Sequence, residues 1–197
     1  HYPLRRQRQM CIRDRDKGFD VGHSVRSIKD LRKIAKADVK EYTSYLTRRP
    51  LVSEKKIDDE ISKTLSSLWS KEKFYKAKKD EQIIRHREYH STSFNLEPNL
   101  KESPGTLRDF QTALWILQHC YNLSDIKSIK DSPIFKDEFK IASKSYDFIK
   151  TLRFALNIIN KGNRLNFESQ LDISKLAKLK LNNSNKAVEE MMKSFYE

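Results

Sequence analysis

The chain has 197 residues, and its 40 Lys and Arg residues against 27 Asp and Glu residues give a formal net charge of +13. Apolar residues make up 37% of the chain and include ten Phe, eight Tyr and two Trp, a composition that excludes a wholly disordered protein. No run approaches the roughly 18 apolar residues of a membrane span and no secretory signal is evident, so we expect a cytoplasmic protein without a membrane partner.

The two ends of the chain need separate treatment. The first fifteen residues, HYPLRRQRQMCIRDR, have neither a helical nor a strand period, and the string MCIRDR resembles a translated sequencing-adapter read-through. We therefore treat residues 1–15 as an artefact or a disordered segment and leave them out of the fold prediction. Residues 187–196 have helical spacing with no cap signal after them, so we expect a piece of a longer protein.

The first predicted element is a short strand over residues 19–26, FDVGHSVR, in which alternate positions are apolar. Ser27 and Asp30 then form an S-x-x-D capping box, which begins a helix whose apolar face runs to Leu46. Two more helical patterns follow at about 53–70 and 71–90, and the second is so polar that few of its residues require a core.

Residues 93–101 change the period from helix to strand, because Phe94, Leu96, Pro98 and Leu100 alternate with polar residues. Pro98 places this strand at a sheet edge or a strand end. The SPG sequence then predicts a turn with a positive φ at Gly105, and Thr106 and Asp109 would form a second capping box. A helix start of this kind presents backbone N–H groups that can hold an anion. Helices are also predicted at 107–121, from 133 to about 160, near 168–180 and from about 185.

Several catalytic signatures are absent from the sequence. His86 and His90, in HREYH, have the spacing of two zinc ligands on one helix face, but no third ligand follows and the glutamate of a zinc hydrolase is missing. The Asp14-Arg15-Asp16 triplet has no Gly-rich loop before it and begins inside the suspected artefact. No P-loop, His-Asp dipeptide or G-x-S-x-G elbow occurs. We therefore predict no metal ligands within this chain.

The most suggestive group is formed by Glu97, Lys101 and Arg108, together with Asp109. A carboxylate close to cations and a helix N-terminus could serve a metal–nucleotide site. The same residues also fit an ordinary strand edge followed by an intrahelical Arg–Asp cap. The residue types alone leave both interpretations open.

A resemblance to a known family covers the chain from about residue 17 to its end. Five stretches carry it in order: FDVGHSVRSIKDL, ADVKEYTSYLTRR, KFYKAKKDEQIIRHREYHSTSFNLEPNLKESPGTLRDFQTALW, FIKTLRFALNIINKGNRLNFESQL and AVEEMMKSFY. They resemble the bifunctional PII uridylyltransferase/uridylyl-removing enzymes. The third stretch is long and unusual in composition, which makes the resemblance specific.

The resemblance implies a multifunctional enzyme of nitrogen metabolism. In that family a nucleotidyltransferase domain uses Mg²⁺ to transfer UMP from UTP to a tyrosine of the PII signal protein, and an HD domain removes the UMP by hydrolysis. Two further domains sense glutamine as an effector. The family's Gly-rich loop and Asp-x-Asp pair would lie before this chain and its HD motif after it, so we expect this fragment to be inactive alone.

The resemblance also implies a mainly α fold, a helical bundle with a small remnant of a nucleotidyltransferase β-sheet formed by strands near 19–26 and 93–101. Residues 16–106 would be the C-terminal part of the nucleotidyltransferase domain. Residues 107–197 would be a helical domain, cut before the HD domain.

The matched motifs indicate which residues would line the transferase cleft. Glu97 is the candidate for an accessory carboxylate. The family usually has a second glycine where Thr106 stands, which would strain the turn if a positive φ were required there. The other nucleotide or cleft candidates are His23, Ser24, Arg26, Arg49, Arg85, His86, His90, Lys101, Ser103, Gly105, Arg108 and Asp109.

Two other functions compete with this one. A basic helical module that binds nucleic acid is supported by the net charge, but no recognition motif accompanies the charge, and we do not expect nucleic acid as the partner. A purely structural helical bundle with scattered lysines predicts no polar cluster where 93–101 meets the helix at 107.

Overall fold

In a computed structural model of the chain, the structure describes residues 24–52, 54–123, 128–129, 131–132, 135–160, 162–176 and 184–196. These residues contain eight α-helices and, apart from one isolated antiparallel bridge between Asn99 and Arg164, no strand pairing. The prediction of a mainly α fold is confirmed. The chain divides into two compact units, the first ending at Trp69 and the second beginning at Ser70.

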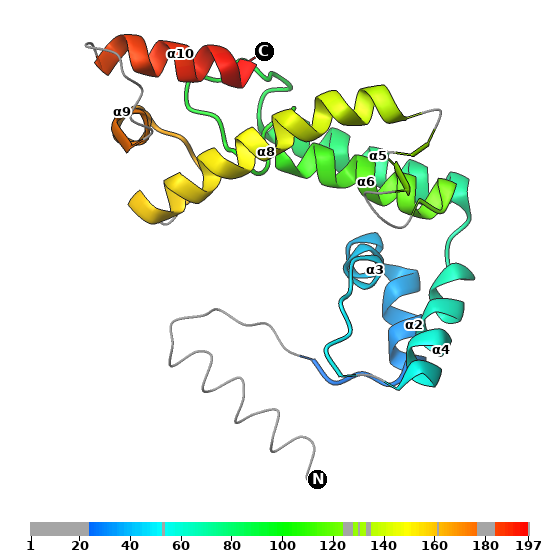
Figure 1. The fold of residues 1–197 in the computed structure, drawn as a ribbon. Coiled ribbons are helices and arrows are strands. Elements are labelled where there is room, and N and C mark those ends of the chain that lie inside the picture. Colours follow the sequence, from blue (N-terminus) through cyan, green and yellow to red (C-terminus); the bar gives the residue numbers. More distant parts are fainter. Residues whose placement is uncertain are drawn as a thin grey trace. The chain divides into compact units, whose positions relative to one another are not determined.

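The first unit contains α2 (Ile28–Ala37), α3 (Val39–Leu46) and α4 (Lys55–Ser66), and each of these helices packs against the other two (Figure 1). Tyr42 is buried in this unit, and the Trp69 ring lies 6.2 Å from the Tyr42 ring between centroids. The indole N–H of Trp69 donates to the Ala35 carbonyl oxygen at 2.8 Å, which ties the end of the unit back to α2.

The capping box at the start of α2 is confirmed. The Ser27 hydroxyl accepts the Asp30 N–H at 3.2 Å, and the Asp30 carboxylate accepts the Ser27 N–H at 3.1 Å. The single helix predicted to run on to Leu46 is wrong, because the backbone is extended at Asp38. The Asp38 carboxylate accepts the Lys40 N–H at 2.7 Å, so Asp38 acts as an N-cap and begins α3.

The second unit contains α5 (Lys71–Glu88), α6 (Leu107–Tyr121), α8 (Lys136–Ile159), α9 (Phe167–Leu176) and α10 (Ser184–Tyr196). Figure 1 shows α6 beside one half of the long α8, with α9 and α10 at its other end, and α5 packs on α6. Phe74 near the start of α5 contacts His119 near the end of α6, so these two helices are antiparallel.

The apolar core of the second unit lies around α8. The Phe110 ring of α6 stacks on the Tyr146 ring at 4.1 Å and lies 6.0 Å from the Phe139 ring. The buried core residues come from α6, α8, α9, α10 and the loops before α6 and α9: Leu100, Leu107, Ile149, Leu152, Leu156, Leu165, Ile173 and Met191.

The strand predicted at 93–101 is wrong, because this segment folds into turns closed by its own side chains. The Asn95 side chain accepts the Glu97 N–H at 3.1 Å, and the Asn99 side chain accepts the N–H groups of Lys101 and Glu102, each at 3.0 Å. Asparagine side chains that bond the backbone two residues ahead favour turns over strands.

The burial of this segment also departs from the predicted alternation. Leu100 and Pro98 are buried, but Phe94 is 75% exposed and Leu96 is 69% exposed. Pro98 has no N–H to offer a ladder. Its carbonyl oxygen accepts the Leu165 N–H at 2.9 Å, which fastens the loop to the start of α9.

The strand predicted at 19–26 falls mostly outside the described residues, since the structure describes only its last three positions. Those positions, Ser24 to Arg26, do not belong to a strand. The remnant of a nucleotidyltransferase sheet is therefore not seen in the described part of the chain. None of the described helices combines the length and the apolar content that crossing a membrane requires.

Candidate functional site

The site is built around Asp109, at the start of α6. Its carboxylate accepts the Gly105 N–H at 2.7 Å and the Gln82 side-chain amide at 2.9 Å. The ring Nε2 of His86 lies 2.9 Å from one carboxylate oxygen, and Arg85 forms an ion pair with the other. One carboxylate of α6 thus holds three side chains of α5 and the turn between the helices.

Asp109 is an anion held in a largely dry environment. The Arg85 side chain is 9% exposed and the Asp109 side chain 17%. Burial by itself raises the pKa of the Asp109 carboxyl, but the hydrogen bonds from Gln82, Gly105 and His86 and the charge of Arg85 outweigh it and hold that pKa below its ordinary value. The carboxylate is therefore ionised at neutral pH.

A second layer of charge lies further along the same helix pair. The Lys78 side chain is 1% exposed, with its ammonium 2.6 Å from the Glu81 carboxylate and 4.3 Å from the centre of the Trp115 ring. Desolvation lowers the pKa of Lys78, although Glu81 opposes this shift. The Arg108 guanidinium lies 5.8 Å from the same ring and 3.2 Å from the Glu102 carboxylate. The α5–α6 interface is thus unusually rich in charge.

The first turn of α6 does not offer free N–H groups to an anion, contrary to the prediction. The Arg108 N–H donates to the Lys101 carbonyl oxygen at 2.9 Å, and the Leu107 N–H donates to the Leu100 carbonyl oxygen at 3.4 Å. With the Gly105 N–H bound to Asp109, the donors at the start of this helix are used within the chain. An anion site here would have to use side chains.

The turn itself is unstrained at Thr106. Gly105 has the predicted positive φ, at +79°, while Thr106 has a φ of −100° in the extended region. The predicted Thr106–Asp109 capping box is wrong, because the Thr106 hydroxyl donates instead to the Ser103 carbonyl oxygen at 2.5 Å. A β-branched residue is thus compatible with this turn.

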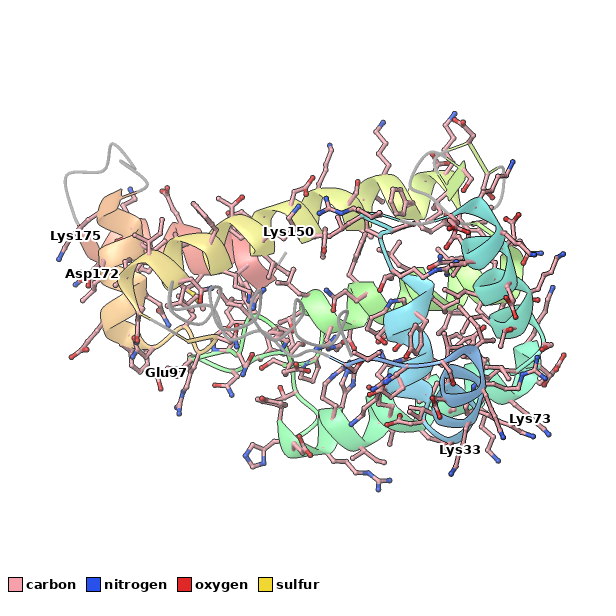
Figure 2. All side chains as sticks on the ribbon, turned by 90° about the horizontal axis from the view of Figure 1, so that it is seen from below. Lys33, Lys73, Glu97, Lys150, Asp172 and Lys175 are labelled. Atoms are coloured by element: carbon pink, nitrogen blue, oxygen red, sulfur yellow. The ribbon has the colours of Figure 1, made fainter. Side chains whose placement is uncertain are left out.

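Glu97 has partners away from the α5–α6 network. Its carboxylate lies 2.7 Å from the Arg164 guanidinium and accepts the Phe167 N–H at 3.0 Å. Phe167 is the first residue of α9, so Glu97 caps this helix from a distance of 70 residues in the sequence. Figure 2 labels Glu97 in the loop beside α9.

The structure brings part of the predicted cleft together. Arg85, His86, Gly105 and Asp109 are in direct contact, while Lys101 and Arg108 are linked through Glu102. Ser103 is buried in the same turn, where its hydroxyl accepts the Asn99 N–H.

Other predicted residues lie apart from this group. His90 is exposed beyond the end of α5, with a positive φ of 57°. In the first unit, Ser24 and Arg49 are exposed, and Arg26 lies 2.6 Å from both the Glu41 carboxylate and the Tyr45 hydroxyl. His23 lies outside the described residues.

The histidine pair does not share a helix face. The helix ends at Glu88, and His90 is already in the left-handed region, while His86 is directed to Asp109. Within the described ranges, no group of three or more His, Cys, Asp or Glu side chains is placed to hold a metal ion.

The comparison with protein families identifies the second unit. A family model described as GlnD PII-uridylyltransferase matches residues 73–197, which include all but the first two residues of α5, the turn and α6. The chain belongs to the GlnD PII-uridylyltransferase family. The predicted resemblance is therefore confirmed, and the Asp109 network lies inside the matched region.

Relatives of this family extend the match over nearly the whole chain. Proteins named bifunctional uridylyltransferase/uridylyl-removing enzyme from Haemophilus influenzae (strain PittEE) and Pasteurella multocida (strain Pm70) are each 37% identical over 92% of this chain. The protein of the same name from Ectopseudomonas mendocina (strain ymp) is 31% identical. The chain spans about 22% of the first two relatives. No solved structure matches it.

Sequence reasoning missed five residues of the two charged layers: Lys78, Glu81, Gln82, Glu102 and Trp115. A signal was present in the sequence. Phe74, Lys78, Gln82 and Arg85 recur at intervals of three and four and so share one face of α5, although only Phe74 is apolar. A helix can use such a face for packing if each charge finds a partner across the interface.

Proposed function

We propose that this chain is a piece of an enzyme that transfers UMP from UTP to a tyrosine of the PII signal protein and, in the intact protein, removes it by hydrolysis. Family membership is the observation that carries the proposal. The names of the relatives give both activities, and the chain spans only about 22% of those relatives. PII, UTP and the effector glutamine are thus proposed as partners of the intact enzyme.

Within this proposal, residues 16–106 belong to the transferase domain and residues 107–197 to the helical domain beside it. The Asp109 network then has a clear mechanical role. Asp109, at the start of the proposed helical part, holds Gln82, Arg85 and His86, near the end of the proposed transferase part, so charge-assisted hydrogen bonds form a joint between the two parts inside the second compact unit. Such a joint would fix the loop 101–106 relative to the cleft.

The transfer reaction requires groups that neutralise phosphate charge. The tyrosine hydroxyl loses its proton as its oxygen attacks the α-phosphorus of UTP, a P–O bond between the tyrosine and UMP forms, and the P–O bond to the departing pyrophosphate breaks. Lys101 is suited to the phosphates because its side chain is 37% exposed and its ion pair with Glu102, at 3.5 Å, is longer than that of Arg108, at 3.2 Å. Arg85 and Arg108 are less exposed and already committed to Asp109 and Glu102. Their role is to position the loop.

Mg²⁺ belongs to the proposed reaction of the intact enzyme, where it would neutralise the triphosphate. We propose that its ligands lie in the part of the intact enzyme outside this chain. Glu97, the candidate for an accessory carboxylate, is occupied by Arg164 and the start of α9. The isolated chain is therefore proposed to be inactive in both directions.

The direct test uses the intact enzyme that contains this sequence. With PII, UTP and Mg²⁺, mass spectrometry should detect UMP on one PII tyrosine, and the 197-residue chain alone should give none. Glutamine should change the balance between transfer and removal. If the intact enzyme leaves PII unmodified while the chain binds generic RNA with a steep salt dependence, the nucleic-acid function would replace this one.

A further inference from the structure

The second unit has an apolar groove away from the Asp109 network. The groove has a volume of about 540 Å³ and lies along the C-terminal half of α8, between α9 and α10. Glu190 is the one charged residue that lines it within the described part of the chain. Its lining residues are Phe148, Thr151, Leu152, Phe154, Ala155, Ile158, Ile173, Glu190, Met191 and Ser194.

Large apolar side chains of this groove are open to water. Phe154 is 70% exposed and Ile158 is 67% exposed, and they lie four residues apart on α8, on one helix face with Thr151 and Ala155. Exposed apolar residues scattered singly are ordinary, but a contiguous apolar groove marks a surface that another structure covers. A row of apolar residues at intervals of three and four suits an amphipathic helix laid into the groove.

Charged residues nearby on α8 and α9 do not line this groove. Lys150 on α8 is 55% exposed, and Asp172 and Lys175 on α9 are 51% and 63% exposed. All three side chains, labelled in Figure 2, are more than half exposed. A nucleic acid or a phosphorylated ligand requires cations, and none of the described residues that line this groove is a cation. Surfaces that bind a partner transiently are ordinarily more polar than surfaces that form a permanent contact.

We infer that this groove is the docking site for an apolar helix face from the part of the intact polypeptide outside residues 1–197. This inference rests on the proposed function only in taking the chain to be a piece of a longer enzyme. About four-fifths of the relatives' length lies outside the matched region. A segment tethered on the same polypeptide is present at an effective concentration on the order of millimolar, so it covers the groove ahead of a separate molecule.

Photo-cross-linking in the intact enzyme tests this docking. p-Benzoylphenylalanine is introduced as Phe154→p-benzoylphenylalanine and, separately, as Ile158→p-benzoylphenylalanine. Ile141 provides the matched control, because it is also on α8 and 70% exposed but does not line the groove. After irradiation, the cross-linked peptides are identified by mass spectrometry, and denaturing electrophoresis separates links within one chain from links between chains.

We expect both groove positions to cross-link within one polypeptide to a peptide outside residues 1–197. The cross-linking yield at each groove position should be about tenfold above the yield of Ile141→p-benzoylphenylalanine. This ratio corresponds to about 1.4 kcal/mol of free energy gained by burying apolar surface in the groove. Links to residues 1–197 of the same chain, links between two copies, or yields equal to the control would each overturn the inference. Cross-linking needs no UMP transfer, so its outcome is independent of the test of the proposed function. Unchanged circular dichroism verifies that each variant is folded.

Discussion

The Asp109 carboxylate of α6 forms an ion pair with Arg85 of α5, and both side chains are largely buried. The same carboxylate closes the turn before α6 through the Gly105 N–H. A single side chain thus connects the two helices and the loop that links them. This arrangement makes the stability of the second unit depend on one ionised group.

Asp109→Asn should therefore be strongly destabilising. The change removes the charge that compensates Arg85, whose Nε–H is already buried without a hydrogen-bond partner in the described part of the chain. Breaking a buried ion pair on one side costs about 3–5 kcal/mol, and the partial exposure of Asp109 lowers our expectation to about 2–4 kcal/mol. Urea unfolding followed by circular dichroism measures the loss.

The matched control for this measurement is Asp147→Asn. Asp147 pairs with Lys150 at 3.4 Å on the surface of α8, and its side chain is 73% exposed. Exposed pairs of this kind contribute about 0–1 kcal/mol. Equal effects of the two substitutions would contradict the role assigned to Asp109.

The pH dependence of stability has a definite sign. Burial opposes ionisation of Asp109 and Glu102, but hydrogen bonds and the cations around them hold both pKa values below the ordinary 3.8 and 4.5. At acidic pH the unfolded chain therefore binds more protons than the folded chain. The stabilisation from these two carboxylates is complete above about pH 5 and is lost as the pH falls through their pKa values in the folded chain. Urea midpoints measured from pH 6 down to pH 3 should decrease, and less steeply in Asp109→Asn. A parallel slope in the variant would show that other carboxylates control acid unfolding.

The buried Lys78 allows a test of the second charged layer. Lys78→Met removes a desolvated charge and keeps much of the volume, so we expect unchanged or increased stability. Glu81→Gln instead leaves the ammonium without its counter-charge and should cost about 1–3 kcal/mol. Thermal unfolding of both variants distinguishes these effects. A large loss in Lys78→Met would mean that its contact with the Trp115 ring contributes more than its desolvation costs.

Two consecutive residues after the end of α5 have a positive φ, namely His90 at 57° and Ser91 at 52°. An L-residue in this region carries a cost of about 1–2 kcal/mol that glycine avoids, offset in part by the greater freedom of glycine in the unfolded chain. Ser91→Gly should therefore raise the free energy of unfolding by about 0.5–1 kcal/mol. Ser93→Gly, at a position without a positive φ, should lower it slightly. Destabilisation by both would contradict the left-handed backbone at Ser91.

The sequence predicted helices better than it predicted the segments between them. The helix 107–121 is confirmed at both ends, because its apolar period is regular and a glycine turn precedes it. The break at Asp38 was missed since the apolar spacing continues through it, and only the N-cap tendency of aspartate indicates a new helix start. The segment 93–101 was predicted as a strand from alternation alone. Asn95 and Asn99 close turns there that the period does not reveal.

The candidate site was predicted in part for a similar reason. Arg85, His86, Gly105 and Asp109 were named from the matched motif, and the structure shows them in contact. Lys78 and Trp115 were missed because a lysine in a polar helix normally faces water. Its burial depends on a ring and a carboxylate that only the folded helix pair brings to it. Burial of charge is a tertiary property, so single-sequence patterns do not predict it.

The most direct test of the proposed transferase role compares two lysine substitutions in the intact enzyme. Lys101→Glu places a negative charge at the proposed phosphate position, while Lys150→Glu makes the same change on the exposed surface of α8. We predict that Lys101→Glu lowers the rate of UMP transfer to PII about 10- to 100-fold, as expected for the loss of a charge-assisted contact of about 1.5–3 kcal/mol, and leaves the rate of UMP removal unchanged. Lys150→Glu should change neither rate. Transfer at the unsubstituted rate in Lys101→Glu, or an equal loss of both activities, would contradict the role of Lys101 in the transferase cleft.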